Sequence, residues 1–363
     1  MSNQVLFVGA GYANLSVLKN WKKNTPKDTE WTLISPSRYK YFPEMTGLYM
    51  EDQYSLEDIR VDLAEFCHRN GGRFLEEKVT AVDRDRKTVL TESGKSLSYD
   101  LLSAGMGLRQ ETGTVPGVRD HALFLNPHEE IPMTAASMQY TEYPVVAGGG
   151  AFGVEFALSL QAWRRANRKK TPVTLITSGP VLPEENKDVR DNVRDLLDER
   201  GLLLYENMPV ERIDADVIYA GSRVLPYGQV LWLDGAKPPL IFDYADLPVD
   251  DKGYLLLSST LQTVGSPDIF GSGAGTVLQE EVNTSKDSIT AFQEAKVLEE
   301  NLDRMLRGKT KLKTFKPPKK ESLVLNMGHR TGFYRRGSKT YISRQAWREK
   351  KKLDKYIMKE IRS

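Results

Sequence analysis

Two glycine-rich segments carry the residues whose types and spacing could do chemistry. The first is Gly9-Ala-Gly11 in "VLFVGAGYANLSVLKN", and the second, in "VVAGGGAFGVEF", has Gly148, Gly150 and Gly153. In the pattern G-x-G-x-x-G the first glycine allows a sharp bend and the second lets backbone N–H groups approach a pyrophosphate. The third lets the following helix pack closely on the strand. The first glycines of the two segments are 139 residues apart, so the sequence predicts two dinucleotide sites in one chain.

The first segment departs from this pattern, because Asn14 stands where the third glycine is expected. The substitution removes the closest approach of helix and strand, but it keeps the two glycines that face the phosphates. We expect the helix to stand off slightly and the Asn14 amide to bond to the loop or to the ligand. A glycine turn without a ligand is the alternative, and it applies more readily to this segment alone than to the pair.

Both segments lie between an apolar run and a helical pattern. After the first turn, Leu15, Leu18 and Trp21 share one helix face, and Trp31–Ser35 has the apolar character of a parallel strand. This is a βαβ unit. A helix is predicted near Leu56–Arg69, and the stretch after it reads as a strand, a hairpin and another strand.

A second strand–turn–helix unit begins at Tyr143, with its next strand at residues 172–179. The C-terminal region has a strand-like piece, "SLVLNMG", and a final helix from about Arg344. The predicted fold class is therefore α/β, with two dinucleotide-binding units and a small C-terminal module.

Composition narrows the chemistry. The 363 residues, 40% hydrophobic and 28% charged, suit two or three globular domains. No apolar run reaches the length of about 18 residues typical of a membrane-spanning helix, and a strand beginning by Val5 leaves no room for a signal peptide. Cys67 is the single cysteine, which excludes an internal disulfide or a C-x-x-C pair. Four scattered histidines give no metal-site spacing, and we expect a cytoplasmic protein with Cys67 buried in a helix.

Charge is distributed unevenly along the chain. Residues 304–363 contain 20 Lys and Arg and 4 Asp and Glu, a net charge of +16, so the overall charge of +2 leaves −14 for residues 1–303. In the last helix, Leu353, Ile357 and Ile361 recur on one face beside Trp347 and Tyr356. This pattern favours either packing on the body of the protein or binding to an anionic membrane surface. Nucleic acid or a protein partner is the remaining alternative, with nucleic acid unlikely.

With both segments placed, the chain resembles the FAD-dependent pyridine nucleotide oxidoreductases, in particular the type II NADH dehydrogenase-like proteins. It looks closest to the branch fused to selenophosphate synthetases, whose first segment also replaces the third glycine. The motifs that carry the resemblance occur in family order: "TLIS", "KYFPEMTGLY", "SYDLLSAGMG", "VVAGGGAFGVEFALSL", "VTLITSGPVLP", "VLWLDGAKPP", "SPDIFGSGAG", "AFQEAKVLEENL" and "AWREKKKLDKYIM".

The resemblance implies a glutathione-reductase-like fold of two Rossmann-like domains. Residues 1–140 and 257–314 would bind FAD, residues 141–256 would bind NADH or NADPH, and residues 315–363 would form the basic module. It also implies these site residues: for FAD, Gly9, Gly11, Asn14, Ser35, Pro43, Met45, Val79, Gly107, Gly273 and Ala274; for NAD(P)H, Gly148, Gly150, Gly153, Glu155 and Gly235; and as catalytic residues, Glu155 again and Gln293.

Besides Asn14, three further sites, with four residues in all, depart from the family pattern. Ser35 replaces the usual ribose-binding acid, and Ala274 replaces an aspartate that bonds the ribityl chain, which removes a hydrogen bond worth about 1–3 kcal/mol. Thr177-Ser178 ends the strand after the second segment, with neither an acid for a ribose 2′-hydroxyl nor an arginine for a 2′-phosphate. NADH and NADPH therefore both stay open. Glu155 also has a structural interpretation, as an acid near a helix N-terminus.

The implied activity is hydride transfer from NAD(P)H to FAD and electron transfer to an external acceptor, with a quinone the most consistent acceptor. A single cysteine rules out a redox disulfide. The implied location is the cytoplasm or the inner face of the cell membrane, and a homodimer is compatible with it. The competing hypothesis is a degenerate member, with weak or no flavin, that serves as a nucleotide sensor or a scaffold.

Overall fold

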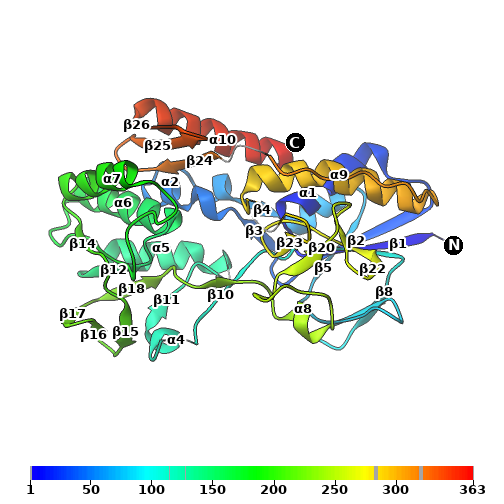
Figure 1. Ribbon diagram of the computed structural model, residues 1–363, viewed down its shortest axis with the longest axis horizontal. Coiled ribbons are helices and arrows are strands. Elements are labelled where there is room, and N and C mark those ends of the chain that lie inside the picture. The colour runs from blue at the N-terminus through cyan, green and yellow to red at the C-terminus, as the bar shows by residue number, and fades with distance from the viewer. Residues whose placement is uncertain (1, 114, 127, 282–284, 319–321, 363) are drawn as a thin grey trace.

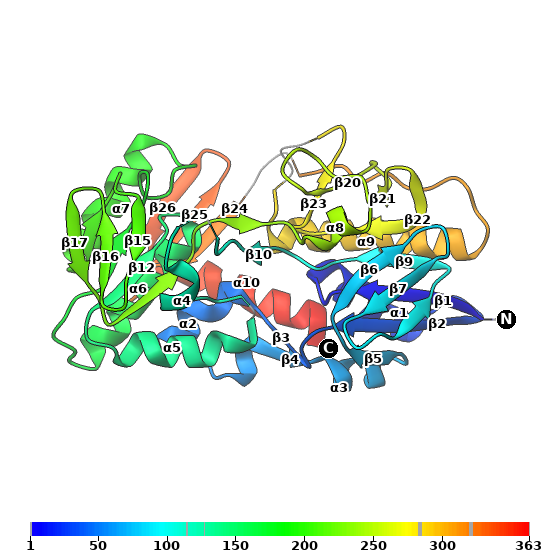
Figure 2. The same ribbon diagram turned by 90° about the horizontal axis from the view of Figure 1, so that it is seen from below.

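The computed structural model describes residues 2–362 except 114, 127, 282–284 and 319–321. Its larger sheet is built from two separate parts of the chain, residues 3–104 and residues 255–278 (Figures 1 and 2). Strand β1 pairs in parallel with β2 and β9, and β9 pairs in parallel with β22. The strand order is β23-β20-β21-β22-β9-β1-β2-β5. The bounds are β1 Asn3–Val8, β2 Thr29–Ser35, β5 Arg73–Glu76, β9 Leu101–Ala104, β20 Leu255–Leu257, β21 Gln262–Thr263, β22 Ser266–Gly271 and β23 Thr276–Leu278.

Two helices pack together beside this sheet. Helix α1 (Tyr12–Asn24) buries Leu15, Leu18 and Trp21, the face that the helical pattern predicts, and it packs against α9 (Ser288–Leu306). Asp287 caps α9 by accepting a hydrogen bond from the backbone N–H of Thr290. The βαβ unit predicted around the first glycine segment is therefore present.

The smaller sheet is entirely parallel and lies within residues 122–232, with the order β11-β18-β12-β13-β14. Its core strand, "PVVA", is buried along its whole length, as expected for a parallel strand covered on both faces. The bounds are β11 Ala122–Leu123, β12 Pro144–Ala147, β13 Thr174–Ile176, β14 Leu203–Tyr205, β18 Gln229–Trp232, α5 Ile131–Tyr140, α6 Ala151–Ala166 and α7 Lys187–Glu199.

Short elements connect and border the two sheets. Strands β10 and β19 pair with each other between them, and β6, β7 and β8 form the hairpin region predicted after the first unit. Their bounds, with those of the other short elements, are β3 Tyr39–Tyr41, β4 Arg60–Asp62, β6 Val79–Asp83, β7 Thr88–Thr91, β8 Ser96–Ser98, β10 Arg109–Gln110, β15 Val210–Ile213, β16 Val217–Ala220, β17 Arg223–Pro226, β19 Ala236–Lys237, η1 Pro43–Met45, η2 Glu57–Ile59, η3 His128–Glu130, α2 Thr46–Met50, α3 Leu63–Arg69, α4 Val118–His121 and α8 Ile241–Tyr244.

The helix predicted near Leu56–Arg69 is wrong in its first half. Residues Arg60–Asp62 form β4, which pairs with β3, and the helix begins only at Leu63. The Asp62 side chain accepts a hydrogen bond from the Glu65 backbone N–H and so caps α3 at its start. The tertiary pairing of β3 with β4 overrides the helical pattern here.

The C-terminal module is a three-stranded antiparallel sheet followed by one long helix. Its elements are β24 (Ser322–Asn326), β25 (Gly332–Arg336), β26 (Lys339–Ser343) and α10 (Arg344–Arg362). Figure 1 shows α10, in red, running along one side of the molecule from the smaller-sheet unit toward α1. The module contacts α6 of one unit and α1 of the other. The predicted strand and final helix are both present.

Candidate functional site

The first glycine turn lies directly against the backbone that follows β9. Gly9 has φ +91°, and a Cβ at Gly9 or at Gly11 would lie 2.6 Å from the carbonyl oxygen of Gly105. Only glycine therefore fits at these positions without moving the chain. Gly11 immediately precedes α1, and no side chain caps this helix. Its N-terminal N–H groups are therefore left for another partner, which suits a phosphate.

Asn14 is fully buried and bonds to the loop. Its Nδ2 donates to the carbonyl oxygen of Gly9 at 2.9 Å, and its Oδ1 accepts from the Ser103 hydroxyl at 2.7 Å. A Cβ at Gly105 would lie 2.5 Å from Nδ2 of Asn14. The asparagine thus fastens the turn to β9. The sequence predicted that the Asn14 amide bonds either to the loop or to the ligand, and the structure shows bonds to the loop. The contacts of Asn14 with Gly105 and Ser103 could not be predicted from the sequence.

The late glycine loop stacks on the same backbone. A Cβ at Gly275 would lie 2.7 Å from the carbonyl oxygen of Gly107. Residues 272–275 therefore pack against residues 105–107, which in turn meet the first turn. Three motifs that are distant in sequence form one continuous backbone surface because β22, β9 and β1 are adjacent strands.

At position 274 the chain has an alanine in place of the expected aspartate, and side chains from neighbouring segments bond to the backbone of this loop instead. Glu294 in α9 accepts a hydrogen bond from the Gly273 backbone N–H at 2.7 Å. Lys286 Nζ donates to the carbonyl oxygens of Ala274, at 3.2 Å, and Thr276, at 2.8 Å. Burial raises the pKa of the Glu294 carboxyl to about 7. Neither residue was singled out from the sequence.

The other expected FAD residues lie around this surface. Ser35, buried at the end of β2, follows Ile34, whose carbonyl oxygen accepts from the Gly9 N–H at 2.8 Å. Val79 begins β6, two residues after Glu77, whose N–H bonds the carbonyl oxygen of Ser35. The other expected residues are in nearby short elements: Pro43 and Met45 in η1, and Gln293, half-buried, in α9.

The second glycine segment opens into a separate cavity of about 210 Å³. Gly148 and Gly235 both line it, together with Thr177 and Ser178 at the end of β13. A Cβ at Gly153 would overlap the carbonyl oxygen of Gly148, whereas a Cβ at Gly150 would meet no atom within 4 Å. The remaining lining residues are Glu111, Val115, Ala147, Ile176, Met208, Pro209, Val210, Trp232 and Asp234. The sequence did not point to Glu111, Trp232 or Asp234.

Glu155 is not among the residues that line this cavity. Its side chain lies at the junction of α6, α2 and β24, where its Oε1 accepts a hydrogen bond from the Asn326 backbone N–H at 2.9 Å. A Cβ at Gly47 in α2 would lie 3.0 Å from its Cγ. Burial raises the pKa of Glu155 to about 8, against the lowering effect of the Lys350 ammonium. The carboxyl therefore holds a proton at neutral pH.

Cysteine and metal chemistry find no support in the described residues. Cys67 is buried in α3, and burial raises the pKa of its thiol to about 12, so the thiolate is not available. Across residues 2–362 without the gaps given above, no group of three or more His, Cys, Asp and Glu could hold a metal ion. The buried-thiol interpretation of Cys67 is confirmed.

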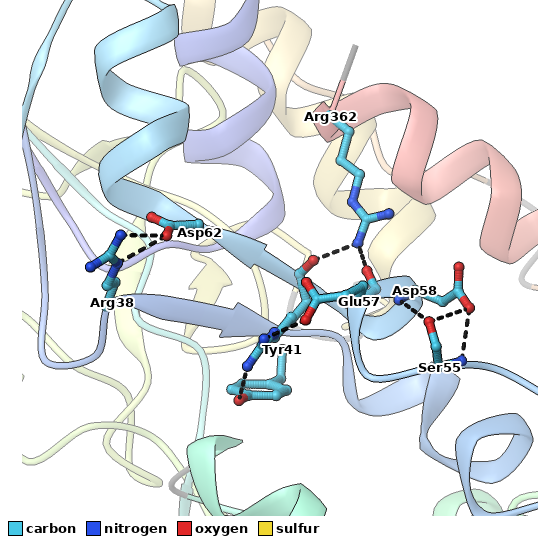
Figure 3. Close-up of polar contacts among 8 residues, drawn as sticks. Arg38, Tyr41, Ser55, Glu57, Asp58, Asp62 and Arg362 are labelled. Carbon is cyan, nitrogen blue, oxygen red and sulfur yellow. Dashed lines mark hydrogen bonds and ion pairs between the residues drawn. The ribbon is translucent and has the colours of Figure 1, made fainter. Parts of the chain in front are cut away.

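The apolar stripe of the last helix packs on the protein itself. Ile357 and Ile361 are buried, and the Lys359 carbonyl oxygen accepts a hydrogen bond from Lys19 of α1 at 2.6 Å. Figure 3 shows Arg362, at the end of α10, directed at the backbone around Glu57, where it donates to the carbonyl oxygens of Glu57 and Arg60. The packing alternative accounts for this stripe, which is therefore not free to enter a membrane. Within the described chain, no helix is both long and apolar enough to span a bilayer.

A family match identifies the class of protein to which this chain belongs. The family described as pyridine nucleotide-disulphide oxidoreductase matches residues 3–295. The chain belongs to this family. It is therefore an oxidoreductase, with FAD as cofactor and a pyridine nucleotide as cosubstrate. The expected α/β fold with parallel sheets is confirmed. The kinship with the branch fused to selenophosphate synthetases stays a prediction.

Individual relatives agree with this assignment. The chain is 25% identical over 339 residues to the type II NADH:quinone oxidoreductase of Staphylococcus aureus, covering 85% of this chain and 83% of that protein. It superposes on the sulfide:quinone oxidoreductase of Aquifex aeolicus with a TM-score of 0.83 at 22% identity, over 99% of this chain and 92% of that one. It superposes on NDH2 of Plasmodium falciparum in complex with NADH with a TM-score of 0.84 at 15% identity, over 99% and 98%. The two structural likenesses show the fold.

The residues at the first turn fit FAD. A Cβ at Gly273 would meet no atom within 4 Å, so the loop leaves room beside it. The hydroxyls of Ser272 and Thr290 are buried without a hydrogen-bond partner, and buried polar groups normally have one. Open glycine backbone, an uncapped helix N-terminus and two unpartnered hydroxyls suit a ligand rich in phosphate and hydroxyl groups.

Proposed function

We propose that the chain is an FAD-dependent NAD(P)H dehydrogenase that passes electrons to a quinone. The observation that carries the proposal is the pairing of two separate glycine turns. The turn at Gly9 and Gly11 packs against residues 105–107, which also contact residues 272–275. The turn at Gly148 opens into the cavity of about 210 Å³. The name of the Staphylococcus aureus relative, an NADH:quinone oxidoreductase 25% identical to this chain, supports a quinone as acceptor. The inert Cys67 supports a route without a redox disulfide.

The two turns have distinct tasks in this proposal. FAD, when bound, supplies the chemistry of accepting a hydride and releasing electrons. Gly9 and Gly11 would hold its pyrophosphate with the N-terminal N–H groups of α1, and Ser272 and Thr290 would bond its polar atoms. Gly148 and Gly150 would hold the pyrophosphate of NAD(P)H at the start of α6. From the sequence limits 1–140, 141–256, 257–314 and 315–363 we propose the same four parts, with the first boundary moved to about residue 121. The reason is that β11 pairs with β18 and α5 packs against β18, so both elements belong to the NAD(P)H-binding part.

Glu155 is the proposed proton-holding group of the acceptor site. A quinone needs two electrons and two protons to become a quinol, and NAD(P)H supplies a hydride, which is two electrons and one proton. The second proton must come from water through the protein. A buried carboxyl that keeps its proton at neutral pH, beside Gly47 and the segment containing Pro43 and Met45, suits that step. Gln293 stays a candidate for contact with the acceptor.

The nucleotide preference follows from Ser178. This residue is exposed at the end of β13, where many dinucleotide sites carry an acid or an arginine, while Thr177 is buried beneath Gly149. A neutral hydroxyl neither repels a 2′-phosphate nor binds it strongly. We propose that NADH and NADPH both enter the site, and assays with each nucleotide in parallel test this.

Flavin reduction tests the function directly. The purified protein should be yellow, and either NADH or NADPH should bleach it under anaerobic conditions. Gly150→Val should give a yellow protein that NAD(P)H no longer bleaches, because the added side chain points at the nucleotide in a space free of protein atoms. Dithionite should still bleach this variant, as a control for the flavin itself.

Two outcomes would overturn the proposal. A colourless protein that takes up no flavin on reconstitution would favour the nucleotide sensor or scaffold. Loss of flavin, rather than of reduction by NAD(P)H, in Gly150→Val would show that the two turns have been assigned the wrong way round.

A further inference from the structure

A buried carboxyl from α9 reaches the late glycine loop, residues 272–275. Glu294 is 5% exposed, and its Oε2 accepts a hydrogen bond from the backbone N–H of Gly273 at 2.7 Å. Within the described residues no hydrogen bond reaches its other oxygen, Oε1. The carboxyl therefore lies beside the loop in which position 274 has an alanine, and it keeps one oxygen for a further donor.

Two hydroxyls flank this carboxyl. Thr290 is one turn before Glu294, so the two side chains share a face of α9, and Ser272 directly precedes Gly273. Both residues are 2% exposed, and in the part of the chain that the structure describes neither hydroxyl has a hydrogen-bond partner. Buried polar groups normally have one. The three side chains together indicate a ligand with several polar atoms.

The carboxyl selects the kind of ligand atom. A carboxylate accepts hydrogen bonds and repels phosphate, so Glu294 favours hydroxyl groups at this loop. The site that suits phosphate is the first glycine turn, because no side chain caps the N–H groups at the start of α1. Residues 105–107 contact both the turn and the loop. The ligand must therefore place hydroxyl groups on one side of its phosphates.

Strand order identifies these hydroxyl groups. Strands β22, β9, β1 and β2 are neighbours in that order and parallel, so their carboxyl ends meet at one edge of the sheet. A dinucleotide with its pyrophosphate at the end of β1 places its adenosine ribose at the end of β2, beside Ser35. The end of β22 lies on the opposite side and would receive the other half of the cofactor. In FAD that half begins with the ribityl chain, which carries hydroxyl groups.

Lys286 fixes the backbone of the same loop. Its Nζ donates to the carbonyl oxygens of Ala274, at 3.2 Å, and Thr276, at 2.8 Å. The ammonium lies 3.7 Å from the centroid of the Tyr254 ring, which stabilises its charge. The loop is thus held by a cation on its carbonyl oxygens and by the Glu294 carboxyl on the Gly273 N–H.

We propose that Glu294 binds the ribityl hydroxyls of FAD, with Ser272 and Thr290 beside it, and that Lys286 is a positioning residue for their loop. Glu294 supplies from α9 the acceptor that an alanine at position 274 cannot provide. This role rests on the FAD binding that the proposed function uses, and it is independent of the electron acceptor.

The test measures how tightly the FAD-loaded full-length protein holds its cofactor. Free FAD in equilibrium with the protein is separated by ultrafiltration and quantified by fluorescence, which gives Kd. Glu294→Gln, whose amide oxygen can still accept from Gly273, should weaken FAD binding by about tenfold or more, because a hydrogen bond to a charged acceptor is lost. Thr290→Val, which removes only a hydroxyl, should weaken it by a smaller factor.

Ala274→Asp separates direct binding from a purely structural role. In combination with Glu294→Gln it should recover most of the lost affinity, because it returns a carboxylate to the loop. In the parent, where Glu294 already provides one, it should give little gain. The matched control is Glu299→Gln on the same helix, whose carboxylate accepts from Asn20 instead, and it should leave Kd unchanged. Melting temperatures measured in parallel show which variants are folded.

Four outcomes would overturn the role of Glu294. They are a Glu294→Gln variant that binds FAD as tightly as the parent, a loss that Glu299→Gln shares, a loss that Ala274→Asp does not correct, and a parent that takes up no FAD. The last would also reject the proposed function. If Glu294→Gln does not fold, an unchanged Kd in Thr290→Val overturns the site and a weaker one supports it. The expected FAD affinities in a protein that reduces no quinone would uphold the ribityl contact and reject the quinone function.

Discussion

At the scale of single residues, Asn14 is a substitution that the surrounding chain has accommodated. Its amide joins the first turn to β9 through Gly9 and Ser103, and Gly105 leaves the space that it fills. A comparison that only counts glycines would treat position 14 as a defect in the dinucleotide-binding motif. The hydrogen bonds instead connect two segments of the proposed FAD site.

Restoring the glycine should therefore do harm. Asn14→Gly should lower the free energy of unfolding by about 1–3 kcal/mol, because the Ser103 hydroxyl and the Gly9 carbonyl oxygen lose buried partners. FAD retention on gel filtration should not improve. Ser103→Ala, which removes one of these partners, should show a smaller loss. A variant that is as stable as the parent and binds FAD more tightly would contradict the role given to Asn14.

The second prediction concerns Glu155 and how the free energy of unfolding depends on pH. Its pKa is near 4.5 as a free side chain and about 8 when folded, so the folded state binds the proton more tightly. The stability from this group is complete below about pH 4.5 and is lost as pH rises through 8. Glu155→Gln, which can still accept from Asn326, should lack this loss.

Chemical unfolding at pH 5, 7 and 9 measures the effect. Between pH 5 and pH 9 the parent should lose on the order of a few kcal/mol relative to Glu155→Gln. Parallel stability curves for the two proteins would show that Glu155 is ionised in the folded state. Other buried acids, Glu294 among them, contribute equally to both proteins and cancel in the comparison.

At the scale of elements, the turn before α6 depends on one close approach. A Cβ at Gly153 would overlap the carbonyl oxygen of Gly148, whereas a Cβ at Gly150 meets open space. Gly153→Ala should push α6 away from β12, lower the melting temperature and weaken NAD(P)H binding. Gly150→Ala is the matched control and should keep the melting temperature of the parent. Equal melting temperatures for both variants would contradict the close packing of helix and strand.

The sequence predicted these elements where local signals sufficed. The apolar strands and glycine turns of both βαβ units were readable because their side-chain periodicity and backbone needs are local. Residues 60–62 were read as helix because their pairing with β3 is a tertiary contact. The surroundings of Glu155 could not be read either, since Gly47, Asn326 and Lys350 come from three distant parts of the chain. Gly105 and Glu294 were missed because each matters only through a contact made after folding.

At the scale of the whole molecule, the C-terminal module joins the two nucleotide-binding units. It bonds Glu155 and Glu51 through Asn326, Glu44 through Lys350, and Glu185 through Arg335. Its exposed face carries Arg344, Arg348, Lys352, Lys355 and Lys359. Binding to an anionic membrane surface therefore stays a prediction. It now rests on the charge of this basic face, because the apolar stripe is packed against the protein.

Vesicle binding tests that prediction without disturbing the packed stripe. Arg348→Glu combined with Lys355→Glu should weaken binding to anionic vesicles by about tenfold or more, since each basic residue near such a surface contributes about 1 kcal/mol. Arg119→Glu combined with Arg223→Glu is the control, because α4 and β17 lie on the side opposite α10 in Figure 1. Binding that is insensitive to salt, or equal in the two double variants, would remove the membrane surface as a partner.

The strand order also dictates a sequence of events during synthesis. The smaller sheet uses only residues 122–232, whereas the larger sheet begins at β1 and needs β20–β23, which emerge from the ribosome after the smaller sheet is complete. Domains tend to fold as they emerge, so we expect the inner unit to close first while the outer half-sheet waits with β9 unpaired on one side. That exposed edge would be a natural place for a chaperone to bind the nascent chain. The edge of β9 is covered when β22 pairs with it, and this pairing brings the late glycine loop, residues 272–275, onto residues 105–107.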